Sequence, residues 1–527
     1  MRIKGKRLGI LIAFLTPLWL TLSFPKFDFS CLAWICLVPL LVAISRLKKT
    51  EAFIFSWMIG WVAYQGIFSW IYQVEGFSFF HGFLAGLYLG FYVGLFGLLI
   101  KLPDSGSYSY PVFVALIWVT LEYIRSNLLF LAFPWALLGQ TQYQNINLIQ
   151  ISSITGVYGI SFLVALVNAS VAMMIDQWVP VSHQKWRKKD YAAFGSCLAP
   201  ILFIIMISLW GMNIQKRDGV RDGIRLGVVQ GNIAQDIKWK QDTIVWTFDR
   251  YEALTKEVAQ EKPSLIIWPE TAIPLNAFSY PRVFWRILTL SKGIQTPIIF
   301  GAAGAAKVGV SENKSRQKYN SAFYCSSGGK ILGEYQKIRL LPFGEYIPSL
   351  GRVSFSFLNP GLKGKFDAGS HIKLFPLNEA SFGVTICWEN IFPNLFRGFV
   401  LKGASFMINI SNDAWFKDSA GPHQHLMCQV FRAVEHRIAI ARAANTGISC
   451  FIDPFGRIIK RVEGDAGKDL NVSGVAYADI PLKQRPTFYT LYGDVFVLTC
   501  MIILGLGLFY QVMRKIVSLR LRGKETC

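Results

Sequence analysis

Long apolar runs alternate with short polar loops over the first 212 residues, and one more apolar run lies near the C-terminus. A transmembrane helix needs about 20 mostly apolar residues. The first run has no small-residue cleavage site and further runs follow it, so it indicates a helix and not a signal peptide. We predict eight spans, which are Leu8–Phe24, Phe29–Ser45, Ala52–Tyr72, Phe79–Ile100, Tyr110–Phe130, Tyr158–Trp178, Tyr191–Met212 and Tyr492–Met513.

The pattern of residues 213–491 differs, because short β-branched runs alternate with stretches of helical periodicity. This alternation predicts a layered α/β domain. The chain then has three parts: a seven-span transmembrane domain (1–212), this domain (213–491), and an eighth span with a basic tail (492–527). The predicted strands are Arg225–Gln230, Ser264–Trp268, Ile298–Gly301, Ser321–Cys325, Phe382–Ile386, Phe406–Ile410 and Ile448–Ile452, and the predicted helices are Asp242–Gln260, Tyr280–Lys292, Phe392–Lys402 and His423–Ala441.

Composition agrees with a membrane protein, since 53% of the residues are hydrophobic and only 16% are charged. Soluble proteins carry about 25% charged residues. The net charge of +22 is high, but the basic residues gather in short clusters beside the apolar runs. This placement is typical of membrane orientation and not of nucleic-acid binding.

The basic clusters also predict the orientation of the chain. They lie at residues 2–7, 46–49, 185–189 and 514–524, and all four fall on one side if each predicted span is crossed once. Lys and Arg are enriched in cytoplasmic loops. We therefore expect residues 213–491 on the opposite, extracytoplasmic side.

Cys387 is the candidate nucleophile among the nine cysteines. No CxxC pair occurs, and the cysteine spacings do not suggest a disulfide framework. Cys387 ends the predicted strand Phe382–Ile386, and a strand end places a side chain at the rim of a sheet, where backbone N–H groups can face an oxyanion. A thiol there becomes nucleophilic when a base or a cation favours the thiolate. The alternative is a buried core cysteine.

Two charged residues qualify as partners of this thiol. Glu270 follows the apolar strand that ends at Trp268, and a carboxylate in such a setting suits general-base catalysis. Its alternative role is a charge in the first turn of a helix. Lys337 lies in a polar stretch of the chain. A cation there can stabilise an oxyanion, and its alternative role is a solvated surface charge.

Taken together, the three residues match a family pattern. Glu270, Lys337 and Cys387 occur in this order along the chain. The domain resembles the nitrilase superfamily, which implies an α-β-β-α sandwich and a Glu–Lys–Cys catalytic triad. The matching strings are Trp268-Pro269-Glu270, Tyr335-Gln336-Lys337, Ile386-Cys387-Trp388-Glu389, Asn409–Phe416 and Arg442–Gly447.

The predicted membrane spans make this resemblance more specific, because they indicate one family within the superfamily. A nitrilase-like domain between spans seven and eight is similar to the apolipoprotein N-acyltransferase family, whose members act last in bacterial lipoprotein maturation. This implies a bacterial inner membrane, with the catalytic domain in the periplasm. Trp388 is one departure, because some members have Tyr there. Further matching strings are Leu20–Pro25, Phe133–Trp135, Gln230–Ile233, Lys238–Trp239 and Pro342–Pro348.

The resemblance also implies a ping-pong acyl transfer. The Cys387 thiolate attacks an acyl ester of a phospholipid, typically phosphatidylethanolamine, while Glu270 passes the thiol proton to the leaving alcohol. Lys337 and a backbone N–H near Trp388 hold the oxyanion. The α-amino group of the diacylglyceryl-cysteine of an apolipoprotein then attacks the thioester. We expect a monomer without a cofactor or a metal.

Other residues in the matching strings are expected to support this site. Glu345 orients Lys337 or assists the general base, and Glu389 orders the loop around Cys387 or forms a structural ion pair. Asn412 is expected to fix the active-site loop by hydrogen bonds to the backbone. Aromatic side chains should exclude water from the thioester, and the candidates are Trp239, Trp388, Trp415 and Phe416. The alternative for each of them is ordinary core packing.

Three other functions compete with acyl transfer. A membrane-anchored nitrilase-type amide hydrolase would use the same triad on a soluble substrate. A scaffold or a transporter would not need the triad, and a transporter is expected to show internal symmetry. A zinc site at His423, His425 and Cys428 is the third alternative, although this spacing gives no single ligand face.

The loop Leu128–Tyr143 is unusual, because it is apolar and has few charges. We predict a re-entrant or interfacial segment there, with its aromatic residues at headgroup depth. Glu122 and Arg125 lie one turn apart at the end of the fifth span. They are predicted to form a structural pair, with a functional role as the alternative.

Overall fold

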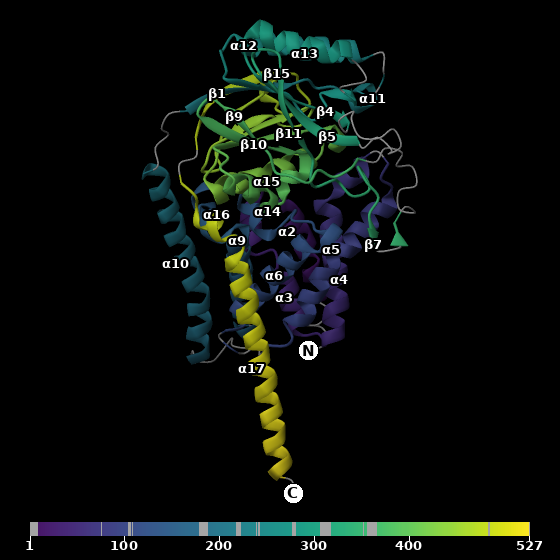
Figure 1. Cartoon of the computed structure of the whole chain (residues 1–527). Coiled ribbons are helices and arrows are strands. Elements are labelled where there is room, and N and C mark those ends of the chain that lie inside the picture. The colour runs from purple at the N-terminus through teal and green to yellow at the C-terminus, as the bar shows by residue number, and fades with distance from the viewer. Residues whose placement is uncertain are drawn as a thin grey trace. The chain divides into compact units, whose positions relative to one another are not determined.

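The computed structural model divides into two compact units. One comprises Met1–Tyr72, Ser78–Ile214 and Asp494–Cys527, and the other comprises Gln73–Phe77 and Gln215–Gly493. The first is helical, and the second combines strands and helices (Figure 1). The residues that the structure describes are 9–74, 76–103, 107, 109–178, 188–217, 223–238, 240, 243–276, 281–305, 318–350, 353–355, 366–482 and 485–525.

Within the described part of the first unit, four helices are long and apolar enough to cross a membrane, with spans over Phe79–Leu99, Val157–Asp176, Leu198–Lys216 and Val495–Arg514. Most residues of the last two spans are not buried inside the protein, as expected for helices that face lipid. The α-helices are α2 (Leu15–Ser23), α3 (Val38–Ser45), α4 (Lys49–Ile67), α5 (Phe79–Leu99), α6 (Tyr110–Asn127), α7 (Ile146–Ile149), α8 (Ser152–Thr155), α9 (Val157–Trp178), α10 (Lys188–Arg217) and α17 (Val495–Glu525).

The second predicted span, residues 29–45, differs from a single spanning helix. A 3₁₀ helix covers Ser30–Trp34, and α3 begins only at Val38. With eight residues, α3 is about 12 Å long, whereas the hydrocarbon core of a bilayer is about 30 Å thick. The break is stabilised from another helix, because the side-chain oxygen of Asn168 accepts a hydrogen bond from the Leu37 backbone N–H at 2.7 Å.

Helices α4 and α5 approach each other along a row of glycines on α5. A Cβ atom on Gly90 would lie only 2.6 Å from the backbone nitrogen of Trp61. Small residues allow this close approach, which matters in lipid because apolar side chains gain little there by leaving the solvent. The glycines of the row recur every three or four residues and are Gly82, Gly86, Gly90, Gly94 and Gly97.

Two buried charges hold the unusual loop 128–143. The Glu122 carboxylate accepts a hydrogen bond from the backbone N–H of Leu138 at 2.6 Å, and the Arg125 guanidinium donates to the backbone carbonyl of Trp135 at 3.1 Å. The loop contains two 3₁₀ helices, η3 (Leu129–Leu131) and η4 (Leu138–Gln142). Irregular backbone in a membrane protein needs hydrogen-bond partners inside the protein, and these two side chains supply such partners to the loop.

Gly90→Ala is predicted to destabilise the protein, because its new methyl group would overlap the Trp61 backbone. Overpacking of this kind costs about 1–3 kcal/mol. The measurement is the apparent melting temperature in detergent. Gly505→Ala on α17 is the matched control, since a Cβ atom there meets nothing within 4 Å. Equal melting temperatures for Gly90→Ala and the wild type would contradict the close helix contact.

The second unit contains two stacked sheets. Tyr324 of the first sheet packs edge-on against Phe382 of the second, with ring centroids 5.4 Å apart. The first sheet has the order β15-β1-β2-β4-β5-β6, with β3 paired to β4, and the second has the order β14-β13-β12-β11-β10-β9. The strands of the first are β1 (Gly223–Gln230), β2 (Leu265–Ile267), β3 (Ile273–Asn276), β4 (Ile298–Ala305), β5 (Lys318–Cys325), β6 (Ile331–Gln336) and β15 (Gly474–Pro481). Those of the second are β9 (Leu374–Leu377), β10 (Ala380–Ile386), β11 (Phe406–Ser411), β12 (Ile440–Ala444), β13 (Cys450–Ile452) and β14 (Ile458–Arg461), and β7 (Ser349–Leu350) with β8 (Val353–Ser354) forms a separate hairpin.

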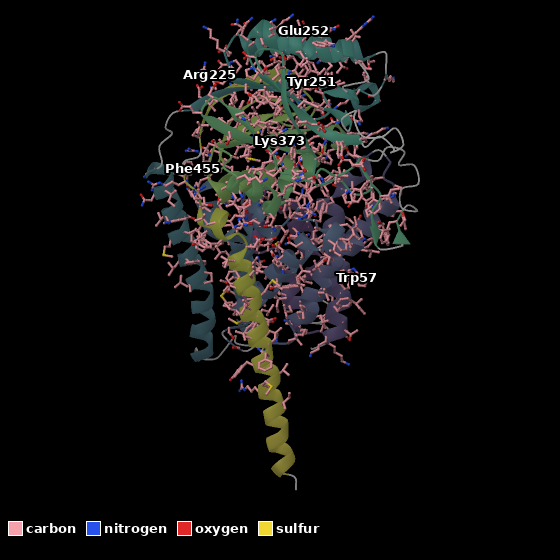
Figure 2. The ribbon with its side chains drawn as sticks, viewed as in Figure 1. Trp57, Arg225, Tyr251, Glu252, Lys373 and Phe455 are labelled. Atoms are coloured by element: carbon pink, nitrogen blue, oxygen red, sulfur yellow. The ribbon has the colours of Figure 1, made fainter. Side chains whose placement is uncertain are left out.

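Helices cover the outer face of each sheet (Figure 1). Helices α12 (Ile244–Ala259) and α13 (Pro281–Ile294) lie on the first sheet, and α14 (Pro393–Leu401) and α15 (Gly421–His436) lie on the second. The first interface is filled by aromatic residues, and Tyr251 (Figure 2) stacks on Trp268 with ring centroids 5.0 Å apart. This order of layers agrees with the predicted α-β-β-α sandwich. The other α-helices among the described residues of this unit are α11 (Gln235–Lys238) and α16 (Phe488–Tyr492).

The predicted helix His423–Ala441 is wrong at its C-terminal end. Helix α15 ends at His436, and Arg437 adopts a left-handed conformation with φ of 48°. The next apolar residues form β12, which lies between β11 and β13. A short apolar run does not distinguish a buried strand from a helix. The seven predicted strands all coincide with observed strands, but the sequence did not predict the strands β3, β6, β7, β8, β9, β12, β14 and β15.

Strand direction decides where the functional residues lie. Strands β1, β2 and β4 are parallel, and so are β10, β11 and β12. Strand β6 is antiparallel to β5, which is antiparallel to β4, so β6 runs in the same direction as β4. The carboxyl ends of β2 and β6 therefore lie at one edge of the first sheet, and those of β10 and β11 lie at one edge of the second.

Candidate active site

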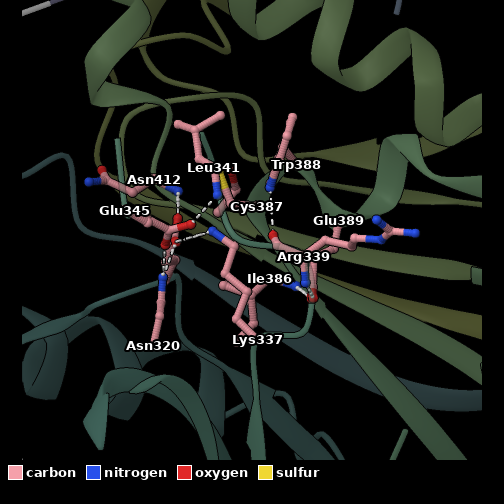
Figure 3. A network of polar contacts seen from close by, with 12 residues as sticks. Asn320, Lys337, Arg339, Leu341, Glu345, Ile386, Cys387, Trp388, Glu389 and Asn412 are labelled. Carbon is pink, nitrogen blue, oxygen red and sulfur yellow. Dashed lines mark hydrogen bonds and ion pairs between the residues drawn. The ribbon is translucent and has the colours of Figure 1, made fainter. Parts of the chain in front are cut away.

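The three predicted catalytic residues follow the carboxyl ends of three strands. Glu270 lies three residues after β2, Lys337 directly follows β6, and Cys387 directly follows β10. Figure 3 shows the Lys337 side chain directed toward the carboxylate of Glu345, with Cys387 close to both. The packing of the two sheets thus brings together residues that are separated by 117 positions in the chain, from 270 to 387.

Lys337 is a buried ammonium between two carboxylates. Its Nζ donates to Glu345 Oε1 at 2.9 Å and to Glu270 Oε1 at 3.4 Å, and its side chain is only 2% exposed. Burial alone would lower the pKa of Lys337, but the two carboxylates raise it above its usual value. Lys337 therefore stays charged at neutral pH and can stabilise a developing oxyanion.

Glu270 is buried and held through both of its carboxylate oxygens. Oε1 accepts from Lys337 and, at 2.7 Å, from the side-chain amide of Asn320. Oε2 accepts from the backbone N–H of Asn412 at 2.9 Å. Donors from three separate segments fix this carboxylate, which is the pre-organisation that a general base requires.

Cys387 has a strained backbone and a neutral thiol. Its φ of 54° lies in the left-handed region, which is uncommon for residues other than glycine and is often found at functional sites. Loss of water around the sulfur raises the pKa of the thiol, and Glu270 raises it further, whereas Lys337 lowers it in part. The resting thiol is therefore protonated at neutral pH, so that it needs a base such as Glu270 to become a nucleophile.

A buried polar cluster holds the backbone of Cys387. The Asn409 side-chain amide donates to the Cys387 carbonyl at 3.1 Å, and its oxygen accepts from Arg442 at 2.7 Å and from Gln429 at 2.6 Å. Arg442 pairs in turn with Asp413, and both side chains are fully buried. Burial alone would raise the pKa of Asp413, but Arg442 lowers it well below its usual value, so Asp413 balances the Arg442 charge.

Glu389 joins the strand of Cys387 to the segment of Lys337. Its carboxylate accepts from the backbone N–H of Ile386 at 2.8 Å and from the backbone N–H groups of Ile338 and Arg339 at 2.7 and 2.9 Å. Burial raises the pKa of Glu389 to about 7, against the effect of these hydrogen bonds. The Tyr335 hydroxyl also donates to this carboxylate at 3.0 Å. These contacts favour the predicted role in ordering the loop around Cys387 over that of a structural ion pair.

The other predicted residues have different positions. Asn412 lies beside Glu270, because its backbone N–H donates to that carboxylate, and its side-chain nitrogen donates to Gln235 at 3.0 Å. Trp388 is buried, and its indole N–H donates to the Arg339 carbonyl at 2.6 Å. Trp415 is 38% exposed. Trp239 lies outside the residues that the structure describes.

Sequence reasoning missed two site residues, Asn320 and Asn409. Asn320 donates to Glu270 and, at 2.8 Å, to Glu345, so it links the two carboxylates that hold Lys337. The only signal in the sequence was a polar residue next to the predicted strand Ser321–Cys325. Asn409 begins a matching string, but nothing local indicated its contact with Cys387.

The geometry does not favour the alternative zinc site. The two ring nitrogens of His425 are 3.1 Å from Asp413 Oδ1 and 3.0 Å from Asn390 Oδ1, so both are used within the buried cluster. Among the described residues, no group of three or more His, Cys, Asp or Glu side chains has an arrangement that suits a metal ion.

Two family models match the chain. The model described as apolipoprotein N-acyltransferase N-terminal domain matches residues 17–170, and that described as carbon-nitrogen hydrolase matches residues 225–486. The apolipoprotein N-acyltransferase of Geobacter metallireducens is 36% identical over 505 residues, which cover 94% of this chain and 93% of the relative. That of Rickettsia prowazekii is 30% identical over 400 residues, or 73% of each chain. An amidase of the nitrilase superfamily from Nesterenkonia AN1 aligns with 53% of this chain and 95% of its own, at 14% identity and a TM-score of 0.37.

The layered domain and its family match define an enzyme with a carbon-nitrogen hydrolase domain. The helical region before this domain matches a second family model, which describes the N-terminal domain of apolipoprotein N-acyltransferases. The chain belongs to the apolipoprotein N-acyltransferase family.

Asn320→Leu is predicted to slow acylation of the enzyme, because Glu270 and Glu345 would each lose a buried hydrogen-bond donor. Unsatisfied buried groups of this kind cost about 1–3 kcal/mol, which corresponds to a rate loss of about 5-fold to 150-fold if it falls on the transition state. The measurement is the rate of acyl transfer from a labelled phospholipid.

Lys318→Met is the matched control, since Lys318 lies on the same strand but is exposed. If Asn320→Leu kept the wild-type rate, Asn320 would have no part in holding the two carboxylates.

Proposed function

We propose that the protein transfers a fatty acyl chain from a phospholipid to the α-amino group of the N-terminal diacylglyceryl-cysteine of apolipoproteins. The observation that carries this proposal is the placement of Cys387 beside a buried Lys337 with its two carboxylates, in a chain of the apolipoprotein N-acyltransferase family. Glu270, Lys337 and Cys387 would form the catalytic triad.

The first half-reaction forms an acyl-enzyme. Glu270 takes the thiol proton of Cys387 as the sulfur attacks the ester carbonyl of the phospholipid. The Lys337 ammonium stabilises the negative oxygen of the tetrahedral intermediate, together with a backbone N–H near Trp388. When the C–O bond breaks, Glu270 gives the proton to the leaving oxygen. A lysophospholipid departs and a thioester stays on Cys387.

The second half-reaction consumes the thioester. The free α-amino group of the apolipoprotein attacks the carbonyl carbon, and Lys337 again stabilises the oxyanion. Glu270 accepts a proton from the nitrogen and returns it to the sulfur as the C–S bond breaks. The products are an amide and the Cys387 thiol. Thioesters react readily with amines, so that this step requires no ATP.

Lipid transfer is favoured over the alternative of a membrane-anchored amide hydrolase. The four apolar helices of the described chain would keep the catalytic domain at a membrane, where both lipid substrates are concentrated. Such pre-organisation lowers the entropy cost of bringing reactants together. The likeness to a nitrilase-superfamily amidase concerns overall topology, whereas the N-terminal match is to the acyltransferase family itself.

Several finer points belong to the same proposal. The acyl donor is phosphatidylethanolamine, and the protein acts as a monomer. The chain has eight spans and lies in a bacterial inner membrane, with the catalytic domain (213–491) on the periplasmic side. Domain 1–212 carries the first seven spans, and 492–527 carries the last span with a basic cytoplasmic tail.

Cys387→Ala is predicted to abolish transfer of a labelled acyl chain from phospholipid vesicles to a synthetic diacylglyceryl-cysteine peptide, because no thioester can form. Cys31→Ala is the matched control, since it removes another thiol that is exposed. Acylated peptide is measured by mass spectrometry. Transfer by Cys387→Ala at the rate of the control would exclude the thioester route.

The proposed topology predicts which surface lysines can be reached from outside the cell membrane. Lys460→Cys in the catalytic domain should react with a membrane-impermeant maleimide in intact spheroplasts, above the background of the parent protein. Lys48→Cys should react only after permeabilisation. Both side chains are exposed in the structure. The opposite labelling pattern would place the catalytic domain in the cytosol.

A further inference from the structure

The two half-reactions of the proposed function differ in their proton balance. In the first, the thiol proton ends on the leaving alcohol, and none is released. In the second, the attacking amine starts as an ammonium near neutral pH, because α-amino groups have a pKa of about 7.7–8.0. It loses two protons on becoming an amide. One of them restores the Cys387 thiol through Glu270, so the other needs a second acceptor.

Lys238 is a buried amine next to Glu270, and it has no role in the triad chemistry described above. It ends helix α11, and its side chain is 1% exposed. Its Nζ donates to the backbone carbonyl of Glu270 at 3.1 Å. This is its one hydrogen bond to the part of the chain that the structure describes, although an ammonium has three donors. The surroundings of Lys238 therefore favour a neutral amine over an ammonium.

Helix α11 is fixed to the catalytic residues at its first residue as well as its last. Gln235 accepts a hydrogen bond from the Asn412 side chain at 3.0 Å, and the Asn412 backbone N–H donates to the Glu270 carboxylate. Asp236, the acidic residue of the same helix, is exposed to solvent. The position of Lys238 relative to Glu270 is thus set by two independent connections.

Burial and the neighbouring acidic groups shift the pKa of Lys238 in opposite directions. Burial lowers the pKa of Lys238 to about 7, although the nearby Glu270 carboxylate and, after it, Cys387 both raise it. Two further charged groups lie near Glu270. Lys337 forms an ion pair with Glu270, and Glu345 forms an ion pair with Lys337. Burial therefore brings the pKa of Lys238 close to neutral pH, where its free amine is populated and is able to accept a proton.

We propose that Lys238 is the second proton acceptor of this enzyme and that it takes the first proton from the α-ammonium group of the apolipoprotein. The resulting free amine attacks the thioester carbon and forms the C–N bond. Glu270 takes the second proton from the nitrogen and passes it to the Cys387 sulfur as the C–S bond breaks. The Lys238 ammonium then returns its proton to water, so that the cycle releases one proton.

The test separates the two half-reactions in the full-length protein. Acylation is followed with a phospholipid that carries a labelled acyl chain, and aminolysis is followed after a synthetic diacylglyceryl-cysteine peptide is added to the acylated enzyme. Lys238→Arg keeps a cation and a hydrogen-bond donor for the Glu270 carbonyl, but it cannot accept a proton. Lys238→Met removes the amine. Lys240→Met is the matched control, because Lys240 is exposed two residues further along the chain.

Both Lys238 variants are expected to form the acyl-enzyme at close to the wild-type rate, which also shows that they fold. Aminolysis at pH 7 should slow at least about tenfold, since general bases contribute factors of this size or more. Wild-type aminolysis should fall as the pH drops below about 7, where Lys238 becomes charged. In the variants, this decline should begin near the pKa of the acceptor amine itself, about 7.7–8.0.

Two results would overturn the proposal. One is a proportional loss of both half-reactions with an unchanged pH profile, because Lys238 would then only support Glu270. The other is wild-type aminolysis by Lys238→Arg. A wild-type enzyme that forms no acyl-enzyme from any phospholipid would be a different result, since it would overturn the proposed function and this inference together.

Discussion

The active site depends on one buried cation. Lys337 is removed from water, and transfer of an ammonium into a protein interior costs several kcal/mol unless opposite charges and hydrogen bonds offset it. Glu345 and Glu270 supply the charges, and Asn320 binds both carboxylates. These residues come from the end of β2, from β5, from the end of β6 and from the segment beyond it. The cation is therefore stable only when the first sheet is correctly assembled around it.

The second sheet supplies the proposed nucleophile under a similar constraint. Cys387 has a left-handed backbone, which the Asn409 amide holds through the Cys387 carbonyl. Glu389 then joins the end of β10 to the backbone that follows β6. A strained residue persists only where its surroundings determine it fully. The result is a protonated thiol next to a fixed carboxylate, which is a resting state suited to the acylation that we propose for Cys387.

The sequence predicted those features that are local in the chain. Glu270 and Cys387 end apolar strands within distinctive strings, so they could be found without coordinates. Asn320 and Asn409 could not, because their importance comes from partners brought close only by strand pairing and sheet packing. The helix predicted to continue through Ala441 failed for a related reason, since the neighbouring strands β11 and β13 determine that this apolar run forms a strand. The break within the predicted span 29–45 likewise depends on a distant partner on α9.

The proposed acyl transfer requires that the sulfur of Cys387 carries an acyl chain. This requirement can be checked by the mass of the intact protein after incubation with a phospholipid of defined acyl composition and without an acceptor peptide. We expect an added mass of one acyl group that maps to Cys387 and is removed by neutral hydroxylamine, which cleaves thioesters. An acyl group on another residue, or an unmodified protein in a preparation that actively transfers acyl chains, would contradict it.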